Sequence, residues 1–216
     1  MTIVYLMRHS KGNIKREFVE SEENFQIDNE KYILSVEGEN LAYKYSRLKE
    51  LQCLSTVVSS NYVRCMSTAK YMADINKLPL IIDENFNERK FGINKKEELP
   101  TDFFLKQIRN HDYKLDYGES FNEVKKRMLK GLARIIKSNR GKKSLVVSHG
   151  SSIAFLLSKW CDVDYDKKYI IKFKGKKILE GFNSPELLEL KFDEKNKLVN
   201  LRKIELKKLK TKTDKK

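Results

Sequence analysis

Histidine, arginine and glutamate side chains gather where short apolar runs of the sequence end. Four polar clusters of this kind contain Arg8-His9, Arg64, Glu88 and His149. An arginine presents a planar fork of donors that matches phosphate oxygens, and a neutral imidazole can attack phosphorus. A glutamic acid can protonate the alkoxide that leaves. If the four clusters meet in the fold, these residue types describe phosphoryl transfer through a phosphohistidine.

The segments between the clusters predict the elements that must position them. Short apolar runs typical of buried strands occur at residues 2–7, 54–58, 79–82 and 145–147. Apolar side chains at three- and four-residue spacing predict helices at 35–51, 62–75, 103–108, 118–139 and 153–160. Two final strands, 187–192 and 198–206, are expected to pair antiparallel across a polar turn. A polar loop is expected between the first strand and about Tyr32.

Strands that alternate with helices predict an α/β fold. We expect a three-layer α/β/α sandwich with a mostly parallel central sheet and an antiparallel C-terminal strand. Residues 1–206 are expected to form one domain, and residues 207–216 a basic, disordered tail. In open sheets of this kind, ligands bind outside the carboxyl ends of the strands. Parallel strands would therefore bring the four polar clusters to one edge of the sheet.

Six motifs follow one another in order over residues 2–206, and together they resemble a known family. They are Leu6-Met7-Arg8-His9, Leu34-Ser35 with Gly38 and Ala42, Val58 to Arg64 with Thr68-Ala69, Asn87-Glu88-Arg89 before Phe91-Gly92, Gly118-Glu119-Ser120, and Val147-Ser148-His149-Gly150 with the later Phe182-Asn183-Ser184. The pattern resembles the histidine phosphatase superfamily, in the branch shared by cofactor-dependent phosphoglycerate mutases and small bacterial phosphatases.

The resemblance implies a role for each matching residue. His9 would be the nucleophile that is phosphorylated on a ring nitrogen. Arg8, Arg64 and His149 would form the clamp that holds the phosphate. Glu88 would protonate the leaving oxygen and then activate water. A substrate of this family would be a small phosphorylated metabolite, and neither a metal nor another cofactor is expected.

The loop after His9 departs from the family pattern. Members usually carry Gly-Glu after this histidine and a phosphate-binding asparagine six residues beyond it. Here the sequence continues Ser10-Lys11-Gly12-Asn13, so that Asn13 lies only four residues beyond His9. The resemblance implies that Asn13 contacts the phosphate, provided that this loop is two residues shorter here than in other family members.

Three functions remain open on the sequence alone. The first is a metal-independent phosphomonoesterase. The second is a mutase, which would need a longer segment after Glu88 with paired arginines for the carboxylate of the substrate. Between Gly92 and Gly118 the only arginine is Arg109, so the phosphatase is favoured. The third is a non-catalytic protein that binds through its basic tail.

The overall composition limits the partners and the cellular compartment that can be expected. The 216 residues carry 45 Lys and Arg against 30 Asp and Glu, for a formal charge of +15. The stretch 202–216 alone supplies +6 of this charge, so the charge does not by itself make nucleic acid the expected partner. No apolar segment approaches the length of a membrane span, and the three cysteines form no close pair. We expect a cytoplasmic, reduced protein with no membrane partner. The oligomeric state is not determined by these features.

Other catalytic patterns are absent from the sequence. A cysteine phosphatase needs an arginine six residues after its cysteine, and none of the three cysteines has one. The sequence has no phosphate-binding loop of the nucleotide-triphosphatase type and no cluster of metal ligands. Cys65 is predicted to be a core residue of a helix, and His111 an exposed residue with no role. Substrate specificity is expected to depend on residues 10–30 and 94–117.

Overall fold

A six-stranded sheet forms the centre of the computed structural model, which describes residues 1–13 and 24–206. Its spatial order is β3-β2-β4-β1-β8-β9. The strands are β1 (Thr2–Arg8), β2 (Thr56–Ser59), β3 (Leu80–Ile82), β4 (Lys143–Ser148), β8 (Glu186–Phe192) and β9 (Leu198–Ile204). The first four run parallel, whereas β8 pairs antiparallel with β1 and β9 antiparallel with β8. The predicted fold class is therefore confirmed.

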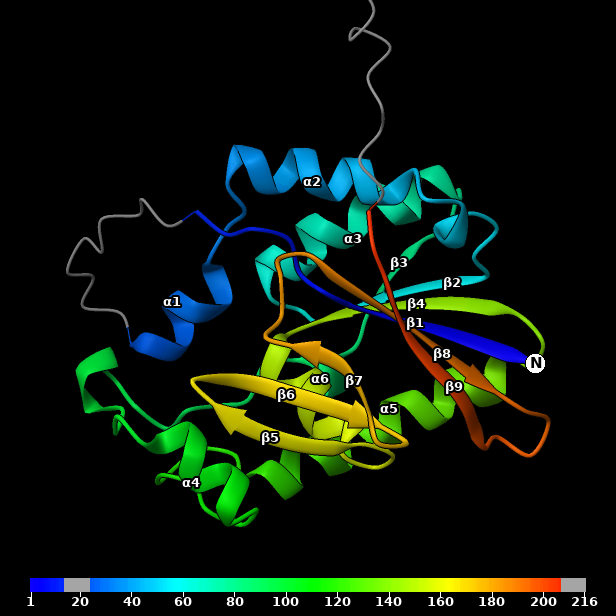
Figure 1. Cartoon of the computed structure of the whole chain (residues 1–216). Coiled ribbons are helices and arrows are strands. Elements are labelled where there is room, and N and C mark those ends of the chain that lie inside the picture. The colour runs from blue at the N-terminus through cyan, green and yellow to red at the C-terminus, as the bar shows by residue number, and fades with distance from the viewer. Residues whose placement is uncertain (14–23, 207–216) are drawn as a thin grey trace, which may run out of the picture.

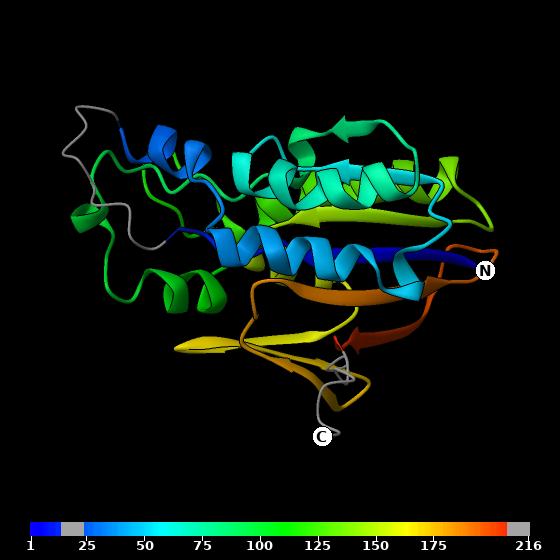
Figure 2. The same cartoon turned by 90° about the horizontal axis from the view of Figure 1, so that it is seen from above.

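Helices cover both faces of this sheet (Figures 1 and 2). Helices α2 (Val36–Ser46) and α3 (Val63–Ile75) lie on one face. Helices α5 (Phe121–Ser138) and α6 (Gly150–Leu157) lie on the other. The short helices are α1 (Phe25–Lys31), α4 (Phe103–Arg109) and the 3₁₀ turns η1 (Lys49–Leu51), η2 (Glu84–Phe86) and η3 (Lys96–Glu98).

The central strand β1 shows why helices are required on both sides. Val4 and Leu6 pack into the cluster formed with α5 and α6, whereas Tyr5 and Met7 pack into the cluster formed with α2 and α3. All four side chains are almost fully buried. Successive side chains of a strand point to opposite faces, so an uninterrupted apolar run needs two apolar layers around it.

Two predictions about local structure were wrong. Part of the expected loop before Tyr32 is the helix α1. Asn24 is its N-cap, and the Asn24 side chain accepts hydrogen bonds from the backbone N–H groups of Gln26 and Ile27. This helix has no buried residue, so its sequence lacks the apolar stripe that would have indicated it. Its place is instead fixed by side-chain contacts with distant segments.

The second error concerns residues 162–180, for which no strand was predicted. They form a separate antiparallel sheet of β5 (Asp162–Asp166), β6 (Lys168–Phe173) and β7 (Lys176–Glu180). In β5 three exposed aspartates alternate with the half-buried Val163 and Tyr165. Such alternation is typical of a strand with one face in water. Aspartate is depleted in strands, so the composition of this segment did not indicate one.

The expected disordered tail, residues 207–216, lies outside the described residues, as does the part of the predicted specificity loop at 14–23. Over the two described ranges, the helices are too short or too polar to cross a bilayer. That residues 1–206 form one domain stays a prediction.

The loop after β1 approaches helix α2 closely at Gly38. A Cβ atom added to Gly38 would lie 2.0 Å from the carbonyl oxygen of Lys11. The Ser10 hydroxyl donates a hydrogen bond to the Gly38 carbonyl at 2.7 Å, and Ser35, which caps α2, donates its backbone N–H to the Lys11 carbonyl at 3.0 Å. The loop that follows β1 is thus held against the first turn of α2, and only glycine permits this distance.

We expect Gly38→Ala to destabilise the protein by about 1–3 kcal/mol, because the added methyl group overlaps backbone atoms. The sign is opposite to that expected for an exposed helix position, where alanine is favoured over glycine. Urea denaturation measures the effect, with Asn40→Ala on the exposed side of α2 as the control. A Gly38→Ala variant at least as stable as the parent would show that the contact is not constrained.

Candidate active site

The carboxyl ends of three parallel strands meet at one edge of the sheet. Arg8 in β1 is in register with Ser148 in β4, and Ser59 in β2 with Val147 in β4. The pairing continues past the strands, because the His9 N–H donates to the Ser148 carbonyl at 3.0 Å. His9 and His149 therefore lie side by side, with ring centroids 5.4 Å apart. The predicted convergence of polar clusters at this edge is confirmed.

The imidazole of His9 has one nitrogen fixed by the backbone. Its Nδ1 lies 2.8 Å from the carbonyl oxygen of Ser10. A carbonyl oxygen only accepts hydrogen bonds, so Nδ1 carries the proton and Nε2 keeps its lone pair. Burial, together with the positive charges of Arg64 and Arg8, holds the pKa of His9 well below its ordinary value of 6.5. The ring is therefore neutral at physiological pH, which is the state that a nucleophile requires.

His149 is the N-cap residue of α6 and is completely buried. Arg64 Nη2 lies 3.0 Å from its Nδ1, and Ser60 Oγ lies 2.9 Å from its Nε2. A guanidinium group only donates, so Nδ1 accepts and the ring proton is on Nε2. Burial and the charge of Arg64 also lower the pKa of His149 well below 6.5. His149 Nε2 then donates to Ser60 Oγ, and the Ser60 hydroxyl donates to Asn87 Oδ1 at 3.0 Å.

Arg64 lies in the first turn of α3 and is buried beside His149. Its Nη1 donates to the carbonyl oxygen of Asn29 in α1. The same short helix is attached to the neighbouring Tyr62, because the Gln26 amide donates to the Tyr62 hydroxyl at 2.6 Å. Helix α1, which was predicted as loop, therefore covers the Arg64 side of the site.

Arg8 projects from the end of β1 toward the start of α6. Its Nη1 donates to the Phe182 carbonyl at 2.7 Å and lies 3.4 Å from that of Asn183. Its buried Nε has no hydrogen-bond partner among the described residues. A Cβ added at Gly150 would lie 3.6 Å from this nitrogen, so the donor lies beside the first residue of α6. A buried donor without a partner is costly, and an anion at this position would satisfy it.

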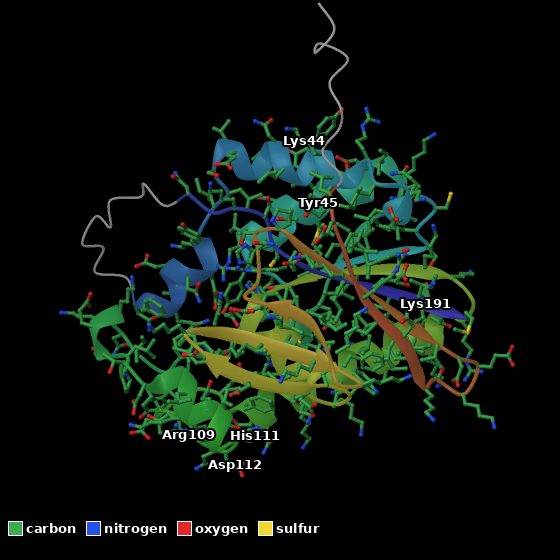
Figure 3. The ribbon with its side chains drawn as sticks, in the orientation of Figure 1. Lys44, Tyr45, Arg109, His111, Asp112 and Lys191 are labelled. Carbon is green, nitrogen blue, oxygen red and sulfur yellow. The ribbon has the colours of Figure 1, made fainter. Side chains whose placement is uncertain are left out.

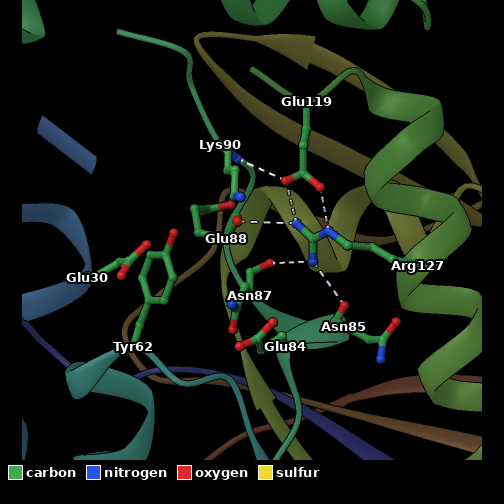
Figure 4. A pocket seen from close by; sticks show the side chains of 9 residues that line it. All are labelled: Glu30, Tyr62, Glu84, Asn85, Asn87, Glu88, Lys90, Glu119 and Arg127. Atoms are coloured by element: carbon green, nitrogen blue, oxygen red, sulfur yellow. Dashed lines mark hydrogen bonds and ion pairs between the residues drawn. The ribbon is translucent and has the colours of Figure 1, made fainter. Parts of the chain in front are cut away.

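Glu88 lies on the other side of the site, after η2. Its Oε1 is 3.1 Å from Ser152 Oγ in α6 and accepts from the Arg89 N–H at 3.1 Å. With Tyr62 it lines a pocket of about 290 Å³ (Figure 4). The Tyr62 ring lies 4.8 Å from the His149 ring, centroid to centroid, so one wall of the pocket contacts the histidine site.

Arg127 in α5 was not predicted as a site residue, yet it holds the Glu88 segment in place. Its guanidinium forms a two-point ion pair with Glu119, at 2.8 and 2.9 Å. It also donates to the carbonyl oxygens of Asn85 and Asn87 at 2.9 Å and of Glu88 at 3.2 Å (Figure 4). The sequence motif containing Glu119 indicated only the start of a helix, and no local pattern links Arg127 to residues some 40 positions earlier.

Arg89, although part of a converging cluster, points away from the site. Its guanidinium is fully buried, and the nearest of four aromatic rings around it is that of Phe104, 4.4 Å from Arg89 Cζ to the ring centroid. Its Nη1 donates to the Gln107 side chain at 2.5 Å. Arg89 therefore joins the Glu88 segment to α4. Within residues 1–13 and 24–206, the guanidinium groups beside the histidines are those of Arg8 and Arg64.

The other predicted residues are placed as follows. Asn13 donates its backbone N–H to the Ile33 carbonyl at 3.1 Å, beside the bridge between Gly12 and Leu34; a phosphate contact for it stays a prediction. Cys65 is a buried residue of α3, and burial raises the pKa of its thiol to about 12. His111 is exposed near the end of α4 (Figure 3).

In the described part of the chain, no group of three or more His, Cys, Asp and Glu side chains could hold a metal ion.

Comparison with known proteins gives a consistent family. A family model described as the histidine phosphatase superfamily (branch 1) matches residues 4–176. A probable phosphoglycerate mutase of Yersinia enterocolitica is 27% identical over 132 residues, which span 58% of this chain and 61% of that protein. A protein of the same name from Enterobacter is 26% identical over 167 residues, or 73% of this chain and 74% of its own length.

Two solved structures share the fold. A mycobacterial glucosyl-3-phosphoglycerate phosphatase superposes with a TM-score of 0.68 at 16% identity, covering 94% of this chain and 98% of its own. A phosphoserine phosphatase mutant from Entamoeba histolytica, in complex with phosphoserine, gives a TM-score of 0.64 at 18% identity, with 94% and 97% covered. At these identities the likeness establishes the architecture.

The buried neutral histidines predict a loss of stability in mild acid. Below the ordinary histidine pKa of 6.5, the unfolded chain binds protons that the folded His9 and His149 do not. Each buried ring then lowers the free energy of unfolding by about 1.4 kcal/mol per pH unit. Urea denaturation between about pH 7.5 and about pH 5.5 should show a shallower decline for His9→Asn than for the parent.

The control for this experiment is His111→Asn. The ring of His111 is exposed and lies against Phe121, so its removal should change the pH slope less than removal of His9. Equal slopes for the parent and for His9→Asn would mean that His9 takes up its proton normally in the folded state.

Proposed function

This chain belongs to the histidine phosphatase superfamily (branch 1), and on that premise we propose that it is a metal-independent phosphatase that hydrolyses a phosphomonoester through a phosphohistidine on His9. The observation that carries the proposal is the hydrogen bond from His9 Nδ1 to the Ser10 carbonyl. It leaves the Nε2 lone pair available in a ring that is neutral at physiological pH. A nucleophile with this arrangement needs no general base for the first step.

The positive charges around His9 favour a phosphate in front of it. Arg8 and Arg64 are hydrogen-bonded to backbone carbonyls, and within the described ranges neither forms an ion pair with a carboxylate. Their charge therefore remains available to a phosphate dianion. The first turns of α3 and α6 also lack a side-chain cap, so their backbone N–H groups favour an anion there.

The reaction proceeds in two steps in this proposal. His9 Nε2 attacks phosphorus, the ester P–O bond breaks, and Glu88 gives its proton to the leaving alkoxide. Glu88, now a carboxylate, takes a proton from water while the oxygen of that water attacks phosphorus and the P–N bond breaks. Inorganic phosphate leaves, and both His9 and Glu88 return to their starting protonation states. Arg127 and Ser152 act as positioning residues, because they hold the Glu88 segment and its carboxyl group.

Mutase activity is the second candidate, because the matching bacterial relatives are named probable phosphoglycerate mutases. A mutase must hold the carboxylate of its substrate with cationic side chains. The arginine that lines the pocket, Arg127, is already paired with Glu119. Arg109 is exposed at the end of α4 (Figure 3) and is not a pocket residue. These observations favour the phosphatase.

Replacing the nucleophile should remove activity altogether. We expect His9→Ala to reduce hydrolysis of an aryl phosphate to background and to abolish the acid-labile, base-stable phosphoenzyme that rapid quenching traps in the parent. The activity of the parent should persist after EDTA treatment. His111→Ala serves as the control. A phosphoenzyme that still forms on the His9→Ala chain would contradict the assignment.

Replacing the general acid should have an effect that depends on the leaving group. Glu88→Gln keeps the size and hydrogen bonding of the side chain but cannot donate a proton to the alkoxide. We expect alkyl phosphates to lose about 10²–10⁴-fold in kcat/KM. A nitrophenyl phosphate needs little protonation of its leaving group and should lose much less. Equal losses for both substrates would show that Glu88 is a structural charge.

A further inference from the structure

The pocket beside the phosphate site carries more negative than positive charge. Nine residues line it: Glu30, Tyr62, Glu84, Asn85, Asn87, Glu88, Lys90, Glu119 and Arg127. It shares Tyr62 and Glu88 with the site, and Glu88 is the proposed donor to the leaving oxygen. If the proposed function holds, this is where the alcohol portion of the substrate lies. The charges in the pocket then determine which alcohols are accepted.

Two of the charged residues cancel each other. Arg127 and Glu119 form a two-point ion pair, and the remaining donors of Arg127 bind backbone carbonyls (Figure 4). Neither group is available to a substrate without breaking that pair. Glu88 is committed to proton transfer. The charges that remain for recognition are those of Glu30, Glu84 and Lys90.

Glu30 is held at the pocket by a neutral group. The Gln26 amide donates to Glu30 Oε1 at 2.7 Å and to the Tyr62 hydroxyl at 2.6 Å. An amide does not neutralise a carboxylate, and no described cation forms an ion pair with Glu30, which lies beside Tyr62 (Figure 4). Glu84, in η2 on the Asn87 side of the pocket, forms no ion pair with another described residue. The exposed Lys90 offsets one of these two charges at most.

We propose that this pocket selects phosphomonoesters whose alcohol portion carries an ammonium group and disfavours those that carry a carboxylate. The phosphate dianion would lie against Arg8 and Arg64, and the ammonium group between Glu30 and Glu84. Attraction of a cation by two partly solvated carboxylates is modest but acts directly on kcat/KM. The inference rests on the proposed phosphatase activity and names the substrate class for the same site.

Three substrates of nearly equal size separate charge from shape: 2-aminoethyl phosphate, 2-hydroxyethyl phosphate and carboxymethyl phosphate. We expect kcat/KM to decrease in that order for the parent. In the double variant Glu30→Gln with Glu84→Gln, the ratio of the aminoethyl to the hydroxyethyl substrate should fall by roughly threefold to tenfold. Each single variant should give part of this fall. The ratio in the parent should also fall as salt is added, because screening weakens the attraction.

A matched control removes an equal charge elsewhere. Glu194→Gln lies in the exposed turn between β8 and β9 and should leave the ratio unchanged. Thermal melting followed by circular dichroism checks that each variant is folded. If the double variant is not folded, the substrate ratios of the two single variants test the inference instead.

The outcomes distinguish this inference from the function on which it rests. Hydrolysis of the hydroxyethyl substrate without a preference for the aminoethyl one, or a preference that persists in the double variant, would overturn the inference and leave the phosphatase intact. If the parent hydrolyses none of the three and forms no phosphoenzyme with an aryl phosphate, the proposed function itself is wrong, and the inference with it.

Discussion

The arrangement of positive charge at the carboxyl edge of the sheet is the feature on which the rest of the site depends. Arg8 and Arg64 are hydrogen-bonded to the carbonyl oxygens of Phe182 and Asn29, which carry no net charge. Burial lowers the pKa values of the two imidazoles beside them, and the charges of the arginines, Arg64 above all, lower these values further. The same field would hold a phosphate dianion. A carboxylate in place of either carbonyl would weaken both effects.

Arg127 shows the opposite use of the same residue type. Its charge is paired with that of Glu119, and its remaining donors bind three carbonyl oxygens of the segment that carries Glu88. The ion pair reduces the contribution of Arg127 to the local potential without removing it, because its charge still lowers the pKa of His149. In the proposed reaction, the two arginines without a carboxylate partner favour an anion, and Arg127 positions the backbone of the segment that carries Glu88.

The architecture and the pocket have different origins in the chain. Proteins with 16–18% identity share the fold over nearly the whole of this chain, because the parallel strands and their covering helices need only apolar residues of suitable size. The pocket is lined by polar side chains from α1, η2, the segment after η2 and α5, and apart from Tyr62 these side chains are exposed or half-buried. Side chains there can change at little cost to the core, so substrate preference can differ among proteins of one fold.

The sequence by itself determined the elements with a strong local pattern and the residues that follow them. The apolar run of β1 and the spacing of apolar residues in α3 and α5 indicated these elements to within a few residues, because burial on a regular element has a fixed period. Arg8 and His9 could be assigned to the site because parallel strands end at a common edge.

Tertiary structure alone decided the rest. Helix α1 has no apolar face and depends on Gln26 and Asn29 contacting α3, and the aspartates of β5 concealed a strand that packs on distant helices. The direction of Arg89, the bonds of Arg127 and the place of Glu30 beside Tyr62 join residues far apart in the chain, and such contacts leave no local period to read.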